Sequence, residues 1–178
     1  MNYIIFDLEA TCWENRDQSP NEIIEIGAVK INAEGTTVDE FQAFVKPTVH
    51  PTLSDFCTRL TSITQQHVDQ APTFDQAIQL FKDWIGVDQL PYLLCSWGFY
   101  DRRQLREDSD RFGLDKKWIN KHISVKHQHH KLAGTEQPMG MDEALKLEGF
   151  PLQGTHHRGI DDARNIARIF QQYFGQWQ

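Results

Sequence analysis

A pair of carboxylates in the first apolar segment is the earliest place where residue type and spacing suggest chemistry. The segment IIFDLEA, residues 4–10, contains Asp7 and Glu9 and otherwise has the composition of a buried β-strand. Because the side chains of a strand alternate between its two faces, both carboxylates leave the same face of the sheet. Two buried, ionised carboxylates repel each other unless a cation lies between them, and such oxygen ligands favour Mg²⁺ or Mn²⁺ over Zn²⁺. The pair therefore predicts a divalent-metal site, the alternative being a strand end that reaches solvent.

Further acids stand where two helices are predicted to begin. Asp101 follows the apolar run YLLCSW, residues 92–97, and starts a polar helix, where an acid can also serve only as a cap. Two adjacent aspartates begin the last helix, in the segment HHRGIDD, residues 156–162. The apolar stripe of that helix consists of Ala163, Ile166, Ala167, Phe170 and Phe174. Asp162 borders this stripe and is predicted to face the sheet, whereas Asp161 lies on the polar face and pairs there with an arginine.

Two histidines precede these aspartates in the loop that enters the helix. They are His156 and His157. A histidine in a loop is often simply exposed to solvent, although a neutral imidazole can also accept a proton at neutral pH. The residues by themselves do not separate the two.

The order of the predicted elements indicates how these side chains are positioned. A first strand covers residues 2–10, and a hairpin follows over residues 21–47 with its turn at NAEG. Further strands are predicted at residues 92–97 and 118–126, and helices at residues 64–72, 73–86, 100–113, 140–149 and 161–175. Residues 12–21 are expected to form a polar loop. Three strands followed by strands that alternate with helices indicate one α/β domain, residues 1–178, with a mixed sheet.

Composition limits the partners of such a domain. Its 178 residues carry a formal net charge of -7, which argues against a protein that holds nucleic acid by a general excess of positive charge. About half of the 18 Lys and Arg residues lie between residues 102 and 131, so contact with nucleic acid would be local, unless this segment is only a solvated helix face. The three cysteines form no CxxC pair, and no apolar run is long enough to span a membrane. We expect a cytoplasmic protein.

Three short motifs carry a resemblance to a known family. FDLEAT, SWGFYD and HRGIDDA resemble the three exonuclease motifs of the DEDDh 3'-to-5' exonucleases, a branch of the ribonuclease H-like superfamily. The segments LTSITQQHVDQAP and HRGIDDARNIARI are similar to the ERI-type subgroup, which trims RNA 3' ends. The resemblance implies a ribonuclease H-like fold, with a central mixed five-stranded sheet flanked by helices.

The family pattern also implies roles for the acids and for one histidine. Four acids hold two Mg²⁺ or Mn²⁺ ions, here Asp7, Glu9, Asp101 and Asp162, with Asp7 bridging both ions and Glu9 also counted as catalytic. The family histidine stands five residues before the last Asp. Counting back from Asp162 gives His157, whereas counting back from Asp161 gives His156. The helix-face argument selects Asp162, and hence His157 as the general base that takes a proton from the attacking water.

The resemblance further implies how a 3' end is held and what is released. Ala10 and Thr11 contact the terminal sugar, Leu60 wedges the terminal base, and His157 lies against the substrate. Tyr100 and Phe99 are expected to stack on bases, the alternative being core packing, which is favoured for Phe99. The product is a nucleoside 5'-monophosphate. Some ERI-type relatives carry an additional nucleic-acid-binding domain, for which this chain has no room, so tight recognition of a structured RNA is not expected.

Other readings of the sequence remain open. RNA is the favoured substrate, but a general single-stranded DNA exonuclease used in repair is the alternative. A non-catalytic nucleic-acid-binding module is a second alternative, which the retention of four acids disfavours. The segment KHQHHK, residues 126–131, could hold a transition metal if His127 and His129 share a strand face, although a solvated histidine-rich loop is favoured. Such a loop could also present positive charge to nucleic acid.

Overall fold

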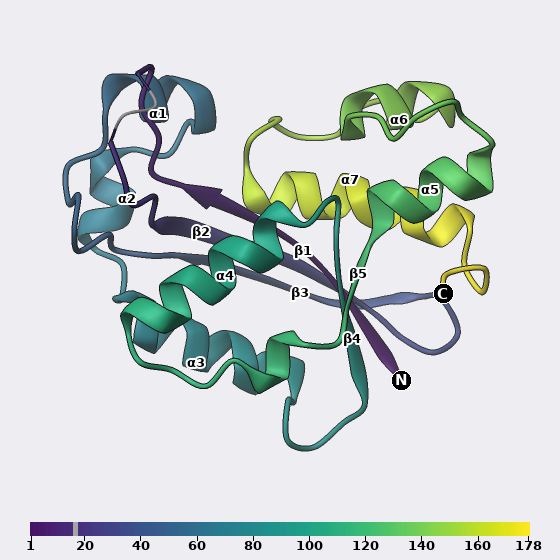
Figure 1. Ribbon diagram of the computed structural model, residues 1–178, viewed down its shortest axis with the longest axis horizontal. Helices are drawn as coiled ribbons and strands as arrows, with labels where there is room; N and C mark the ends of the chain where they lie inside the picture. The colour runs from purple at the N-terminus through teal and green to yellow at the C-terminus, as the bar shows by residue number, and fades with distance from the viewer. Residues whose placement is uncertain (16–17) are drawn as a thin grey trace.

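The computed structural model describes residues 1–15 and 18–178, and a mixed sheet runs through its centre (Figure 1). The expected polar loop at residues 12–21 therefore lies partly outside the described residues. The strands are β1 (Asn2–Ala10), β2 (Ile23–Ile31), β3 (Thr37–Phe44), β4 (Tyr92–Ser96) and β5 (His122–Ser124). Their order is β3-β2-β1-β4-β5. The hairpin strands pair antiparallel, whereas β4 pairs parallel with β1 and β5, which confirms the mixed five-stranded sheet.

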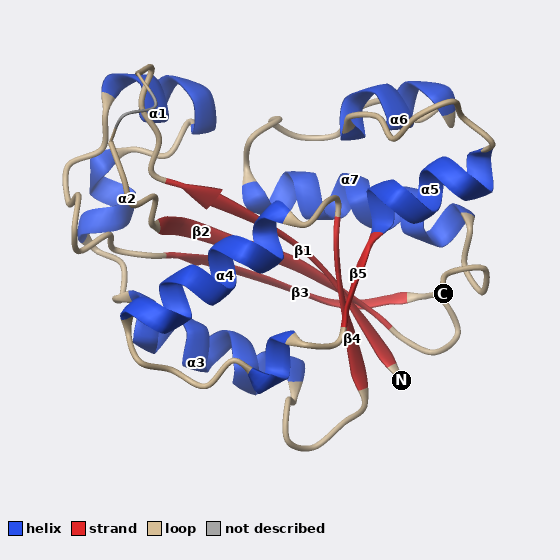
Figure 2. Ribbon diagram, in the orientation of Figure 1, coloured by secondary structure: helices blue, strands red, loops and turns tan. Residues whose placement is uncertain are grey.

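Helices cover both faces of this sheet (Figure 2). They are α1 (Asp55–Thr61), α2 (Gln65–Asp69), α3 (Phe74–Ile85), α4 (Tyr100–Arg111), the short 3-10 helix η1 (Lys117–Ile119), α5 (Val125–Ala133), α6 (Met141–Leu147) and α7 (Gly159–Gln172). Helices α3 and α4 lie on one face, and α5, α6 and α7 lie on the other. None of the described helices is long and apolar enough to cross a membrane.

The side chains of β1 alternate between two hydrophobic cores. Phe6 packs with Phe81 of α3 on one face of the sheet, whereas Ile5 packs with Phe170 of α7 on the other. Odd-numbered residues of β1 therefore face α7. This alternation directs the carboxylates of Asp7 and Glu9 toward the beginning of that helix.

The segment from residue 118 to residue 131 differs from the sequence-based prediction. A single strand over residues 118–126 is wrong, because η1 ends at Ile119, β5 has only three residues, and α5 begins at Val125. The histidine-rich segment is therefore neither a strand nor a loop. Val125 and His129 are both buried, and their spacing of four residues places them on one face of a helix. Pairing of β5 with β4 ends at Ser124, after which the burial of this face favours the helix.

Candidate active site

Four carboxylates from three elements meet at one cavity. Asp7 and Glu9 lie in β1, Asp101 in the first turn of α4, and Asp162 in the first turn of α7. Carboxylate oxygens of Asp7, Glu9 and Asp162 lie within 4.8 Å of one another. Asp101 is fixed beside them, since its Oδ1 accepts a hydrogen bond from the backbone N–H of Leu8 at 3.2 Å. All four acids line a cavity of about 550 Å³.

These acids are held where their ionised forms are unfavourable. Burial, followed by the charge of Asp101, raises the pKa of Asp7 well above its usual range. Burial also raises the pKa of Glu9 to about 9, with the charge of Asp162 as the next cause, and raises the pKa of Asp101 to about 6. The pKa of Asp162 is raised by burial as well. Hard oxygen donors that repel one another in this way are a suitable ligand set for Mg²⁺ or Mn²⁺.

A close contact between two glycines brings α7 down onto the sheet. A Cβ atom added to Gly27 of β2 would lie 2.1 Å from the backbone carbonyl carbon of Gly159. The helix can therefore approach β2 this closely only because neither residue has a side chain. Asp162, one turn further along α7, thereby reaches the carboxylates of β1. Neither glycine is among the residues that the sequence predicted for the site.

A buried ion pair fixes the start of the same helix. Glu25 of β2 is fully buried and accepts hydrogen bonds from Arg158 Nε at 3.1 Å and from the Gly159 backbone N–H at 3.0 Å. Gln42 of β3 donates to its other carboxylate oxygen at 2.7 Å. Glu25 is not among the residues that the sequence predicted for the site. The signal was an acid within the apolar run IIEIGAV, which needs a partner if it is buried.

Both histidines of the loop before α7 lie at the cavity. His157 has a left-handed backbone, with φ of 64°, and its backbone N–H donates to Asp162 Oδ2 at 2.9 Å. His156 Nδ1 lies 3.1 Å from Asp162 Oδ1, and the two imidazole rings stack with centroids 4.0 Å apart. Burial, followed by the charge of His156, lowers the pKa of His157. A neutral His157 is thus available at neutral pH. The contact of His156 with Asp162 was not predicted, because the family spacing linked Asp162 only to His157.

Asp161 lies away from the cavity, on the polar side of α7. Its carboxylate accepts a hydrogen bond from the Thr155 backbone N–H at 2.9 Å and pairs with Arg164 at 3.1 Å. Asp162, in contrast, is only 4% exposed and lines the cavity. The apolar stripe of the sequence predicted this difference between the two neighbours.

Similarity to known proteins identifies the family to which this domain belongs. The family model described as exonuclease, of the RNase T type, matches residues 4–170. The chain belongs to this exonuclease family. Human 3'-5' exoribonuclease 1 is 35% identical over 183 residues, and Xenopus laevis ERI1 exoribonuclease 2 is 32% identical over 196 residues. Each match includes 93% of this chain, which spans 50% of the human protein and 27% of the frog protein.

Solved structures identify the branch of this exonuclease family. The nuclease domain of 3'hExo, described as a DEDDh family member bound to rAMP, superposes with a TM-score of 0.91 and 31% identity. That match covers 97% of this chain and 90% of the other. Escherichia coli exonuclease I, at 12% identity and a TM-score of 0.75, shows only that the fold is shared. The predicted membership in the DEDDh exonucleases, with an ERI-type resemblance and a ribonuclease H-like fold, is confirmed.

Three residues predicted to hold the 3' end of a substrate, Ala10, Thr11 and Leu60, are not among those that line the cavity of the DEDDh acids. Ala10 and Thr11 follow Glu9 and are buried, and Thr11 Oγ1 accepts a hydrogen bond from the Glu22 backbone N–H at 2.9 Å. Leu60 of α1 is 37% exposed and lines a separate cavity of about 570 Å³ with Cys12, Trp13 and Phe56. Ala10 and Thr11, at 8% and 2% exposure, thus present little side-chain surface to a ligand, whereas Leu60 is open to one.

Two aromatic residues directly precede Asp101 in the chain and line the same cavity as the four acids. Tyr100 is 44% exposed and Phe99 is 55% exposed, and both line the cavity. Core packing of Phe99, which the sequence favoured, is therefore wrong. The helix α4 begins at Tyr100, so its buried face turns Asp101 inward and leaves these two rings outside.

The histidines of α5 have separate partners in this exonuclease domain. His129 is buried and its Nε2 lies 2.8 Å from Glu148 Oε1, whereas His130 Nδ1 lies 2.9 Å from Thr135 Oγ1. His127 lines the cavity of the acids and stacks on Phe99, with ring centroids 4.9 Å apart. The helix directs the three histidine side chains to different neighbours. The shared strand face that a transition-metal site in this segment required is therefore absent. His127 at the cavity was not predicted.

Proposed function

We propose that this domain is a 3'-to-5' exonuclease that removes nucleoside 5'-monophosphates from the 3' ends of single-stranded nucleic acid, with RNA as the favoured substrate. The observation that carries the proposal is the convergence of Asp7, Glu9, Asp101 and Asp162 at one cavity with His157 at its edge. The preference for RNA is supported by the names of the relatives, which are exoribonucleases, and by the rAMP bound to the 3'hExo nuclease domain.

The acids and the histidine divide the chemical work between them. Asp7, Glu9, Asp101 and Asp162 would hold two Mg²⁺ or Mn²⁺ ions. When bound, such ions would polarise the scissile phosphate, activate a water and stabilise the leaving 3' oxygen. His157 accepts the proton of that water, for which its lowered pKa keeps it neutral at pH 7.

Residues beyond the acids position the terminal nucleotide. Ala10 and Thr11 would contact the last sugar. Leu60, in the separate cavity, would lie against the terminal base, and Tyr100, in the cavity of the acids, would stack on the nucleotide. The discrimination of RNA from DNA requires a contact to the 2'-OH. Single-stranded DNA is the second candidate substrate class. Comparing the cleavage rates of the two polymers tells which one the enzyme prefers.

The test uses two 5'-labelled single-stranded 20-mers of one sequence, one RNA and one DNA, with Mn²⁺ or with EDTA. We expect a ladder that shortens from the 3' end, faster for RNA, and that is lost with EDTA. Asp162→Asn should abolish the ladder, since the carboxylate lines the cavity, whereas the matched Asp161→Asn variant should keep it. Failure of both 20-mers to shorten with any divalent metal would favour a non-catalytic binding module. Faster shortening of DNA would reverse the substrate preference.

A further inference from the structure

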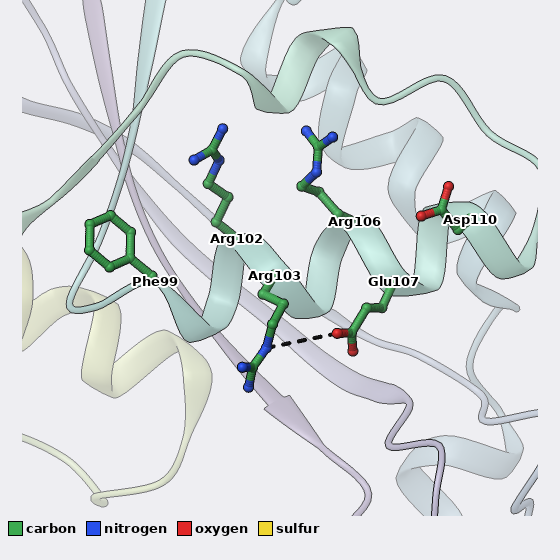
Figure 3. A pocket seen from close by; sticks show the side chains of 6 residues that line it. All are labelled: Phe99, Arg102, Arg103, Arg106, Glu107 and Asp110. Atoms are coloured by element: carbon green, nitrogen blue, oxygen red, sulfur yellow. Dashed lines mark ion pairs between the residues drawn. The ribbon is translucent and has the colours of Figure 1, made fainter.

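A groove along α4 opens next to the cavity of the acids. It has a volume of about 470 Å³ and is lined by Phe99, Arg102, Arg103, Arg106, Glu107 and Asp110. Figure 3 shows Arg102 and Arg106 projecting from the same side of the helix, with Phe99 at its beginning. Phe99 lines both the groove and the cavity, so the two spaces share a wall. A polymer that leaves the cavity past Phe99 meets these arginines next.

The arginines of this groove are only partly neutralised. Arg103 pairs with Glu107 at 3.8 Å, as the dashed line in Figure 3 marks, and Asp110 pairs with Lys116. Within the described part of the chain, neither Arg102 nor Arg106 has a carboxylate partner, although Arg106 Nη1 donates to the neutral Asn120 Oδ1 at 2.9 Å. Two guanidinium charges thus remain available in a protein whose net charge is -7.

One of these guanidinium groups also has an unused hydrogen-bond donor. Arg102 Nε is buried and, among residues 1–15 and 18–178, finds no hydrogen-bond partner. Nearby, burial and then the charge of Arg102 lower the pKa of His122 to about 4, so that this ring stays neutral and does not add to the positive charge. A buried donor without a partner is costly, and the terminal nitrogens of the same guanidinium, which have no hydrogen-bond partner in the described residues, can donate to an anionic oxygen.

An exposed aromatic ring marks the passage between the two spaces. Phe99 is 55% exposed, and its ring stacks on His127 at an interplanar angle of 28°. Rings that are exposed beside a positively charged groove are typical of surfaces that bind single-stranded nucleic acid, because bases stack on the rings while cationic side chains follow the phosphates.

We propose that the groove holds the strand upstream of the 3' end, with a base on Phe99 and successive phosphates at Arg102 and Arg106. This inference rests on the proposed exonuclease function, because it supplies the direction in which the strand leaves the cavity. Arg103 contributes less to phosphate binding, because its ion pair with Glu107 must break before it contacts a phosphate. The groove should raise kcat/KM for a long strand, which reaches it, and not for a dinucleotide, which is too short to reach it.

The experiment compares a single-stranded RNA 20-mer with a dinucleotide of the same 3' sequence at several KCl concentrations. For Arg102→Ala/Arg106→Ala we expect kcat/KM on the 20-mer to fall about tenfold at 0.15 M KCl, and on the dinucleotide to change less than about twofold. Each phosphate contact to a single strand contributes a salt slope of about 0.7, so the plot of log(kcat/KM) against log[KCl] should become shallower by about 1.4. Phe99→Ala should slow the 20-mer without changing the slope.

Two charge controls separate the groove from general electrostatics. Lys82→Ala/Lys131→Ala removes the same number of charges elsewhere, from α3 and α5, and should leave the slope as in the wild type. Arg102→Lys/Arg106→Lys keeps the charges and should restore most of the slope. Since Arg102 is partly buried, Arg103→Glu/Arg106→Glu provides a second test if the alanine variant does not fold.

The outcomes for the groove and for the exonuclease function are distinguishable. An unchanged salt slope in the alanine variant, or equal losses on the 20-mer and the dinucleotide, would overturn the groove. If the wild type cleaves neither substrate, the proposed exonuclease function fails, and fluorescence anisotropy of a labelled RNA 20-mer then tests the groove alone. Binding that weakens in Arg102→Ala/Arg106→Ala supports the groove, and binding that does not weaken overturns it.

Discussion

At the scale of single residues, the stacked pair of His156 and His157 is the part of the site that the sequence could least define. The two residues are adjacent, both reach the cavity, and their rings lie 4.0 Å apart. The alternation of a strand placed Asp7 and Glu9, and the apolar stripe of a helix selected Asp162, because each rule follows from a regular repeat. A loop with a left-handed residue has no such repeat, so the sequence could not foresee that His156 also contacts Asp162.

The two histidines should differ in their effect on rate. We expect His157→Ala to lower kcat by about 10²- to 10⁴-fold, the usual contribution of a general base, and His156→Ala to lower it less. Single-turnover cleavage of the RNA 20-mer with saturating Mn²⁺ measures this difference. A larger loss for His156→Ala would transfer the base role to that residue and overturn the assignment of His157.

Their pH dependence has a definite sign. Burial and the charge of His156 lower the pKa of His157, so the neutral, proton-accepting form persists to lower pH than for a free imidazole. Activity limited by this group should therefore fall only below about pH 6.5. In His156→Ala one lowering effect is removed, and the acid limb of the kcat profile should move to higher pH. An acid limb that does not move, or that moves to lower pH, would exclude this coupling.

At the scale of elements, the sequence predicted the strands β1 to β4 and most of the helices, the short α2 and α6 included, but it missed α1 and α5. Helix α3 has ends close to those predicted, because Thr73 and Gly86 flank a clear apolar repeat and Gly86 adopts φ of 77°. Helix α1 has seven residues and was missed. Its start is fixed by Ser54, whose Oγ accepts a hydrogen bond from the Cys57 backbone N–H at 3.0 Å. For α5, the deciding factor is burial of His129 against Glu148, a contact between distant segments.

The contact of α7 with β2 gives a prediction at this scale. Gly27→Ala would place a methyl group 2.1 Å from the backbone of Gly159, so α7 must shift away from the sheet. Overpacking of this kind costs roughly 1–3 kcal/mol or more, and the displaced Asp162 should reduce activity by at least about 100-fold. Thermal unfolding and cleavage of the RNA 20-mer measure the two effects. For stability the matched control is Gly98→Ala, whose added Cβ meets no described atom within 4 Å.

At the scale of the whole molecule, stability and metal binding are linked through the buried acids. A carboxyl group whose pKa is higher in the folded than in the unfolded chain keeps its proton longer when folded. The folded state then binds more protons than the unfolded state, so this group lowers the free energy of unfolding as pH rises. For Glu9 the window extends from its ordinary pKa of 4.5 to about 9, and for Asp101 from 3.8 to about 6.

Metal-free protein should therefore lose thermal stability between about pH 5 and pH 9, and Mn²⁺ should restore it most strongly at the alkaline end. Glu9→Gln removes one of the repelling charges while keeping nearly the same shape. In EDTA at pH 8.5 we expect its Tm to exceed that of the wild type by roughly 3–8 °C, since 1 kcal/mol moves Tm by about 2–4 °C in a chain of this size. The gain should vanish near pH 4, where the carboxyl group is protonated in both states.

The exposed Glu136 provides the matched control for this effect. Glu136→Gln makes the same chemical change at an exposed position, so Tm should equal that of the wild type at both pH values. With saturating Mn²⁺ the order should reverse at pH 8.5, because Glu9→Gln loses a ligand and binds the ion less tightly. A Glu9→Gln variant that is less stable than the wild type in EDTA at pH 8.5 would show that Glu9 is stabilised by its neighbours even without a cation. The four acids would then be a structural cluster, and their repulsion would no longer argue for a metal site.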